Sequence, residues 1–392
     1  MNIPVQMKRI TLSGQLFCSS KNGVGANSKK GNRLAEYGET SVYLFTNGGL
    51  YARVRQGTVT RSLGPLQDAS HYTNMITWLS PSEFLIVTGD MPDQQLPVEG
   101  EPISVLHYRI TDNAIELVGS TIFGDTLSKP LDMIRLASGA TLLAWYEWVK
   151  GQTVEVNFAY TPDGVDWSLK QSSIFNVNIL PRTNGTLCQH PVDGSIWLFT
   201  ATDSDYNIVA THLTETDGNI SVDWVDNDFT RNAGVLCRDP EFPCMTAIQT
   251  ADTILLAYQN FPDHTFWFWD GAKWGLDYIA AAPYCITSKV TLVDISADGT
   301  KKLRAVVDRY IGRVSPFGLG FQSNGRLWFS GYWFDPSLPP SPWRMKAWLL
   351  PEYTEIEIPT PDEAQIYNGP KFVFSTNRLV YDGINGICER RF

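Results

Sequence analysis

Residues 157–169 read NFAYTPDGVDWSL, two short strand-like runs joined by the turn Asp163-Gly164. In the first run Phe158 and Tyr160 are two residues apart, which is the side-chain period of a β-strand. The Asp-Gly pair is a strong hairpin signal, because glycine adopts positive φ angles at little steric cost. This stretch therefore predicts two antiparallel strands and the turn between them.

Turns of the same kind recur along the whole chain. Successive turns are 56, 51, 54, 53, 54 and 58 residues apart, and runs with period-two alternation lie between them. A second series of turns falls roughly 20 to 30 residues upstream of the first, so one unit reads strand, turn, strand, link, strand, Asp-Gly turn, strand. The main series is Gln56-Gly57, Asp112-Asn113, Asp163-Gly164, Asp217-Gly218, Asp270-Gly271, Asn324-Gly325 and Asp382-Gly383.

A repeated unit of four strands and about 54 residues is typical of a β-propeller. The sequence therefore predicts an all-β protein, a single β-propeller with seven blades of four antiparallel strands, whose ring is closed by N- and C-terminal strands. Six blades is the alternative. In that case the strand near 371–381 pairs with strands near 41–45. A double β-sandwich is the rival architecture.

The predicted domain organisation is an N-terminal arm, 1–36, followed by the propeller, 37–392. Two proline-rich segments, 89–102 and 334–348, interrupt the repeat. Because proline cannot donate to a sheet ladder, we expect both segments to project as loops. Trp333, Trp343 and Arg344 in or beside the second segment are residue types of interface anchors and sugar-stacking platforms, and core packing is the alternative for the tryptophans.

Composition narrows the functional classes. The chain has 392 residues, a hydrophobic fraction of 43% and a formal net charge of −10, which exclude a disordered chain and disfavour nucleic acid as a partner. No apolar run is long enough to span a membrane, and no apolar segment follows Lys8 and Arg9, so we expect cytoplasmic synthesis without a signal peptide. The six cysteines form no C-x-x-C pair. We therefore expect buried free thiols, and neither a metal nor another cofactor.

The segment Thr161-Pro-Asp-Gly-Val-Asp-Trp167 resembles the Asp-box of sialidases and related BNR-repeat propellers, with one residue fewer between Asp163 and Gly164. This resemblance covers repeat units only, within about 130–275. It implies scaffold roles: the aspartate accepts backbone hydrogen bonds, the glycine takes a positive φ, and the tryptophan packs between blades. The residues with these implied roles are Asp163, Gly164 and Trp167, with a weaker copy at Asp270, Gly271 and Trp274.

The same resemblance raises two enzymatic hypotheses. A sialidase needs an arginine triad, a Tyr/Glu nucleophile pair and an aspartate, but the Arg-Ile-Pro motif of that family is missing; the nearest string is Tyr108-Arg-Ile-Thr111. A propeller lyase uses His and Tyr to remove the proton beside a uronate carboxylate. Ordinary ion pairs and loop packing explain the candidates at least as well. They are Arg238, Glu241, Arg309 and Tyr310 for the sialidase, and His71 and Tyr72 for the lyase.

The incomplete catalytic pattern favours a non-catalytic propeller that binds or assembles, and its partners are other protein subunits or a glycan. By fold-level analogy, a phage virion component of the tail or adsorption apparatus fits this description. The alternative is a sialidase-like glycoside hydrolase or a polysaccharide lyase acting on acidic glycans.

Overall fold

The computed structural model describes β-strands and the turns between them. The described residues are 34–37, 40–46, 49–56, 59–68, 73–89, 102–112, 114–124, 128–147, 155–171, 185–201, 208–230, 245–260, 266–269, 274–277, 289–307, 314–321, 327–334, 343–350, 354–357, 372–375, 378–383 and 386–391. They contain no helix, and hence no helix that could span a membrane. The all-β class predicted from the repeat is confirmed.

The described strands form six four-stranded antiparallel sheets, one three-stranded sheet and one two-stranded sheet. Sheet 1 contains β1 (Leu34–Tyr37), β2 (Thr40–Thr46), β3 (Gly49–Gln56) and β4 (Val59–Asp68). Sheet 2 contains β5 (Thr73–Ser80), β6 (Glu83–Gly89), β7 (Ile103–Ile110) and β8 (Ile115–Phe123). Sheet 3 contains β9 (Ser128–Arg135), β10 (Thr141–Glu147), β11 (Glu155–Thr161) and β12 (Ser168–Gln171).

The remaining sheets follow the same order. Sheet 4 contains β13 (Gly185–Gln189), β14 (Ile196–Ala201), β15 (Ile208–Thr216) and β16 (Asn219–Thr230). Sheet 5 contains β17 (Met245–Gln249), β18 (Ile254–Asn260), β21 (Lys289–Ile295) and β22 (Lys301–Val307). Sheet 6 contains β23 (Val314–Phe321), β24 (Leu327–Phe334), β25 (Trp343–Leu350) and β26 (Thr354–Glu357). Sheet 7 contains β27 (Phe372–Ser375), β28 (Arg378–Gly383) and β29 (Gly386–Arg391).

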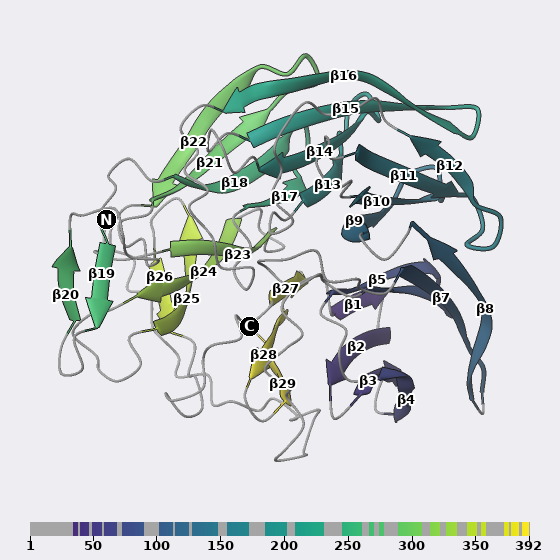
Figure 1. The fold of residues 1–392 in the computed structure, drawn as a ribbon. Coiled ribbons are helices and arrows are strands. Elements are labelled where there is room, and N and C mark those ends of the chain that lie inside the picture. Colours follow the sequence, from purple (N-terminus) through teal and green to yellow (C-terminus); the bar gives the residue numbers. More distant parts are fainter. Residues whose placement is uncertain are drawn as a thin grey trace.

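The first strand of each sheet contacts the first strand of the next. These contacts join β1 to β5, β5 to β9, β9 to β13, β13 to β17, β17 to β23 and β23 to β27, and β27 also contacts β1. Figure 1 shows these strands nearest the middle of the molecule and the fourth strands β8, β12, β16 and β22 at its outside.

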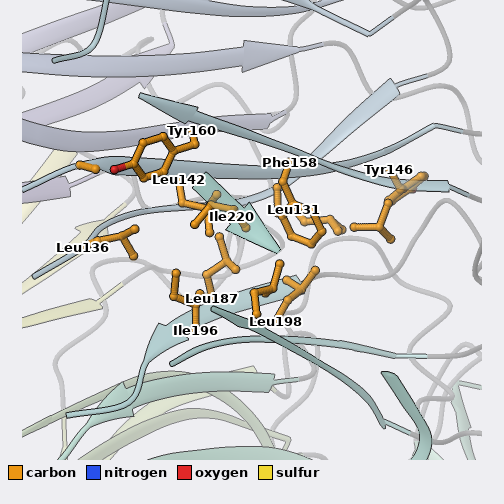
Figure 2. Close-up of a cluster of buried hydrophobic side chains, with 14 of the residues drawn as sticks. Leu131, Leu136, Leu142, Tyr146, Phe158, Tyr160, Leu187, Ile196, Leu198 and Ile220 are labelled. Carbon is orange, nitrogen blue, oxygen red and sulfur yellow. The ribbon is translucent and has the colours of Figure 1, made fainter. Parts of the chain in front are cut away.

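Apolar side chains cover both faces of the central strands of sheet 3, because this sheet packs between sheets 2 and 4. In β10, Leu142, Ala144 and Tyr146 join a core cluster shared with sheet 4 (Figure 2). The alternate residues Leu143 and Trp145 join a second cluster shared with sheet 2. Six of the seven residues of β10 are buried, so the strand reads as a continuous apolar run and not as a one-sided alternation.

Three sequence expectations need correction. Strands β27–β29 pair with one another in their own sheet, so the pairing of 371–381 with 41–45 is wrong. The predicted loop 334–348 is shorter, because β25 begins at Trp343 and pairs with β24 along its length. The turn at 270–271 lies between β19 (Phe266–Trp269) and β20 (Trp274–Asp277), a hairpin inserted between β18 and β21. The turn between the third and fourth strands of sheet 5 is instead 296–300.

Candidate functional site

The two ends of the sheets differ in the length of their connections. In sheets 2 to 6, connections after the first and third strands span two to six residues, whereas those after the second and fourth strands reach 14 residues, and 28 between β18 and β21. Neighbouring strands run in opposite directions, so the longer connections all leave from the same end of each sheet. We call this end the long-connection end and the opposite one the turn end.

Most of the residues predicted to act in catalysis or binding belong to connections at the long-connection end. His71 and Tyr72 fall between β4 and β5, Arg238 and Glu241 between β16 and β17, and Arg309 and Tyr310 between β22 and β23; all six lie outside the described residues. Loop 89–102 follows β6, and most of it is also outside them.

Trp333 and Arg344 are opposite one another in the ladder of β24 and β25, and Trp343 is opposite Phe334. The backbone thus places the three predicted binding residues at the long-connection end of sheet 6.

Two rows of side chains at the long-connection end of sheet 3 form a polar cluster. Ser128 is opposite Glu147 in the ladder of β9 and β10, and Trp145 is opposite Asn157 in the ladder of β10 and β11. The indole Nε1 of Trp145 donates a hydrogen bond to Oε1 of Glu147 at 3.2 Å. Ser128, Trp145 and Asn157 are buried, while Glu147 keeps partial contact with solvent. We call Ser128, Trp145, Glu147 and Asn157 the sheet-3 polar cluster.

Asp132 is a second polar group near the middle of the molecule. It lies in β9 beside an irregularity of register between Ala144 and Trp145. Its carboxylate accepts hydrogen bonds from the backbone N–H groups of Met133 at 2.8 Å and of Leu187 in β13 at 2.7 Å. Burial nevertheless raises the pKa of Asp132 to about 7, against the effect of these hydrogen bonds. Asp132 therefore links sheets 3 and 4 and titrates near neutral pH.

The described cysteine near Asp132 is a buried free thiol. This residue, Cys188 in β13, matches the predicted buried thiols. Burial, together with the nearby Asp132, raises the pKa of the Cys188 thiol to about 12. At neutral pH this side chain is a neutral thiol with no tendency to act as a nucleophile.

The predicted Asp-box turn lies at the turn end of sheet 3 and is closed by its own side chains. Oδ1 of Asp163 accepts hydrogen bonds from the N–H groups of Val165 and Asp166, at 2.8 and 2.9 Å. Gly164 has a φ of 81°, and a Cβ there would lie 2.3 Å from Cδ1 of Leu79 in sheet 2. Trp167 packs edge-to-face on Phe123 of β8, with ring centroids 5.1 Å apart. All these contacts stabilise the fold, and the three residues lie at the turn end, away from the long-connection end.

We predict that Asp163→Ala lowers the free energy of unfolding by about 1 kcal/mol, because two backbone donors lose their acceptor. Asp163→Asn keeps an oxygen at this position and should change it by only a few tenths of that amount. These hydrogen bonds lower the pKa of Asp163, so its stabilising effect should disappear as the pH falls below about 4. Urea unfolding at pH 7 and pH 3 measures both effects; equal losses for the two variants at pH 7 would contradict this role.

His107 is a buried histidine that the sequence did not single out. It lies in β7, with Nε2 3.7 Å from a Glu83 carboxylate oxygen, and Glu83 also pairs with Arg109 at 2.6 Å. Burial lowers the pKa of His107, although Glu83 acts in the opposite direction. The side chain is therefore neutral at pH 7 and is best explained as part of the packing between sheets 2 and 3. Across the described ranges, no three His, Cys, Asp or Glu side chains gather into a metal site.

Comparisons with known proteins return distant structural likenesses. No family model matches the chain, and no curated protein does. A Trypanosoma rangeli sialidase in complex with sialic acid shares 7% identity over 85% of this chain, with a TM-score of 0.47; the match covers 58% of that protein's own length. The polysaccharide lyase Uly1 shares 11% identity, with 99% and 94% of the two chains covered and a TM-score of 0.48.

A third structure, the calcium-binding protein regucalcin from Agrobacterium tumefaciens, shares 11% identity over 81% of this chain and 85% of its own, with a TM-score of 0.39. Sialidase, lyase and regucalcin structures thus all appear among the neighbours. At these identities and TM-scores, none of the three assigns an activity or a ligand to this chain.

Proposed function

We propose that this chain is a non-catalytic seven-bladed β-propeller that binds a glycan through its long-connection end. The contacts between successive first strands, including the contact of β27 with β1, support a closed ring of seven sheets. Closure explains why both faces of sheets 2, 3 and 4 are apolar, because each blade is covered by two neighbours. In this arrangement all long-connection ends share one face of the ring.

The observation that carries the proposal is the difference between the two ends of the sheets. Tight turns need only close a hairpin, whereas connections of up to 14 and 28 residues exceed what strand joining requires. Such connections, displayed on a rigid scaffold, are where binding residues concentrate. The Trp, Tyr, Arg and His candidates named above occur at this end, and these side chains favour glycan stacking and hydrogen bonding.

Among the described residues we find no arrangement of side chains that supports catalysis. Asp132 has a pKa suited to acid-base catalysis, but both of its carboxylate oxygens accept hydrogen bonds from backbone N–H groups. A protein partner and a virion role remain predictions from the sequence, and the closing experiment includes the enzymatic alternative.

The experiment is a glycan microarray that includes neutral oligosaccharides, sialosides and uronate polymers, probed with the full chain. We expect binding without a change in the mass of the bound glycan. Replacing residues 91–100 or 335–342 by a short Gly-Ser linker should weaken binding at least tenfold. The matched control is the same linker inserted between Asp217 and Gly218 at the turn end, which should leave binding unchanged.

Three outcomes would overturn the proposal. The first is an array with no bound glycan, and the second is equal loss of binding after changes at the two ends. The third is release of sialic acid or of unsaturated uronate products, detected by mass spectrometry, which would show an enzyme instead of a binding protein.

A further inference from the structure

We infer that this chain forms a homodimer in which β8 of one copy pairs antiparallel with β8 of a second copy. The inference does not depend on the proposed glycan binding. β8 is the last strand of sheet 2, and no other described strand pairs with its outer edge. It lies at the outside of the molecule (Figure 1). The outer edge of such a strand presents N–H and C=O groups that can pair with another chain.

The internal repeat shows what is unusual about this edge. The fourth strands of sheets 2, 4 and 5 each contain a β-bulge at the equivalent position, after the fourth cross-strand pair from the turn. The extra residue is Val118 in sheet 2, Asp223 in sheet 4 and Arg304 in sheet 5. Asp223 is hydrogen-bonded to His212 at 2.8 Å, and Arg304 forms an ion pair with Asp294 at 2.8 Å. Charged residues and bulges protect outer strands from pairing. Among these three sheets, only sheet 2 has an apolar residue at this position.

The side chains around Val118 are also apolar and exposed. Leu117 is 56% exposed, Val118 41% and Ile122 66%. Residues 117–123 contain no charged side chain, whereas the whole chain has a formal net charge of −10. Two copies therefore repel one another over most of their surface, and an uncharged strand is where they can approach. Three exposed apolar side chains on one outer strand form a patch that a partner would cover.

The charge pattern of β8 suits a second copy of the same strand. Residues 119–123 follow the bulge and pair with β7 without further irregularity, so this segment can pair with itself about a two-fold axis at Thr121. Ile122 would then lie diagonally beside both Ile122 and Val118 of the second copy, within reach of apolar contact. The two Glu116 carboxylates would be ten ladder positions apart, about 34 Å, which is beyond the Debye length of about 8 Å.

The outer strands of sheets 4 and 5 do not suit self-pairing. Pairing of β22 about Leu303 would place Lys302 opposite Arg304 of the second copy, and pairing of β16 about its middle would place Asp223 opposite Asp226. Like charges directly opposite one another are destabilising. Pairing of the acidic β16 with the basic β22 of another copy would avoid this repulsion. It would leave one further edge free on each copy, however, and so would build assemblies larger than a dimer.

The test is the mass of the full chain in solution, measured by light scattering after size-exclusion chromatography over a range of micromolar concentrations. We expect the mass of two chains. Val118→Asp introduces the charge that sheet 4 has at the equivalent position, and Ile122→Lys places a charge at the two-fold axis. Each should raise the dimer dissociation constant at least tenfold. Leu303→Lys is the matched control, because Leu303 is 61% exposed on the outer strand of sheet 5. It should leave the dimer unchanged.

Backbone hydrogen exchange gives a second measurement, in which the N–H groups of 119–123 should exchange more slowly in the dimer than in the Ile122→Lys monomer. A wild-type chain that is monomeric at every concentration would overturn the inference. A dimer that persists in both Val118→Asp and Ile122→Lys would show that another surface is used. Assemblies larger than two chains would favour pairing of β16 with β22. If urea unfolding shows that one variant is destabilised, the other variant decides. None of these outcomes affects the proposed glycan binding.

Discussion

Replacing Trp197 by alanine is expected to lower the free energy of unfolding by about 3–5 kcal/mol, the range for removing a large buried aromatic side chain. Trp197 in β14 is fully buried. Its ring contacts four others, with centroid distances between 5.0 and 5.9 Å, and its N–H donates to Oγ of Ser195 at 3.1 Å. The four surrounding rings are Phe199, His212, Trp224 and Phe229.

This aromatic cluster joins sheet 4 to sheet 5. Lys301 of β22 lies over the ring of Phe229, 4.3 Å from its centroid, and also donates a hydrogen bond to the Phe229 carbonyl oxygen. Gly299, in the turn before β22, lies close enough that a Cβ there would be 3.6 Å from Trp197. An alanine at position 197 would therefore leave a cavity between two sheets, which neither can fill without moving.

Trp224→Ala is the matched control for this prediction. The Trp224 ring belongs to the same cluster but is 39% exposed, so its removal should cost about 1 kcal/mol, mostly through its loss of contact with His212 and Trp197. Urea unfolding followed by circular dichroism measures both variants. Equal losses for the two tryptophans would mean that the cluster does not bind the sheets together.

The second large effect concerns pH. Because the folded protein holds a proton on Asp132 up to about pH 7, whereas an unfolded aspartate loses it near pH 4, the folded state binds more protons in this interval. Stability should therefore fall as the pH rises from about 4 to about 7 and change no further through this group above that value. Three pH units correspond to at most about 4 kcal/mol.

Asp132→Asn tests this expectation, since asparagine resembles the protonated acid and does not titrate. Its stability should depend less steeply on pH than that of the wild type between pH 5 and 7, measured by urea unfolding at half-unit steps. Subtracting the stability curve of Asp132→Asn from that of the wild type isolates the contribution of Asp132. His107 is present in both proteins, and its lowered pKa makes stability rise with pH instead of fall. Asp298→Asn, in an exposed turn, is the control. Parallel wild-type and Asp132→Asn curves would refute the assignment.

The sequence predicts the strands well because local signals determine them. Period-two runs such as the one before Asp163 predict strands on their own, and Asp-Gly pairs mark many of the turns. The hairpin at 266–277 carries the same signals, and the sequence therefore predicts its turn as one of the repeated turns. In the structure this hairpin is an insertion, because β18 pairs with β21 on the far side of it. Likewise, the prolines before Trp343 favoured a longer loop, whereas pairing with β24 extends the strand to that residue.

The candidate site was less predictable for a different reason. Asn157, Glu147 and Ser128 are ordinary strand residues in the sequence, and their meeting depends on the registers of β9, β10 and β11. Asp132 depends on a local irregularity of pairing and on a neighbouring sheet. Neither feature leaves a motif, because cross-strand neighbours are distant along the chain. Burial of an unpartnered amide is visible only once the sheets are assembled.

The turn at Asp217-Gly218 is a suitable site for attaching the protein to a surface. Both residues have positive φ, 50° and 75°, and a side chain at position 218 would meet no atom within 4 Å. A biotin acceptor peptide placed here would anchor the molecule to a sensor chip by the end that carries the tight turns. The opposite end would then face the flowing sample, where even long polysaccharides could approach without steric obstruction from the support.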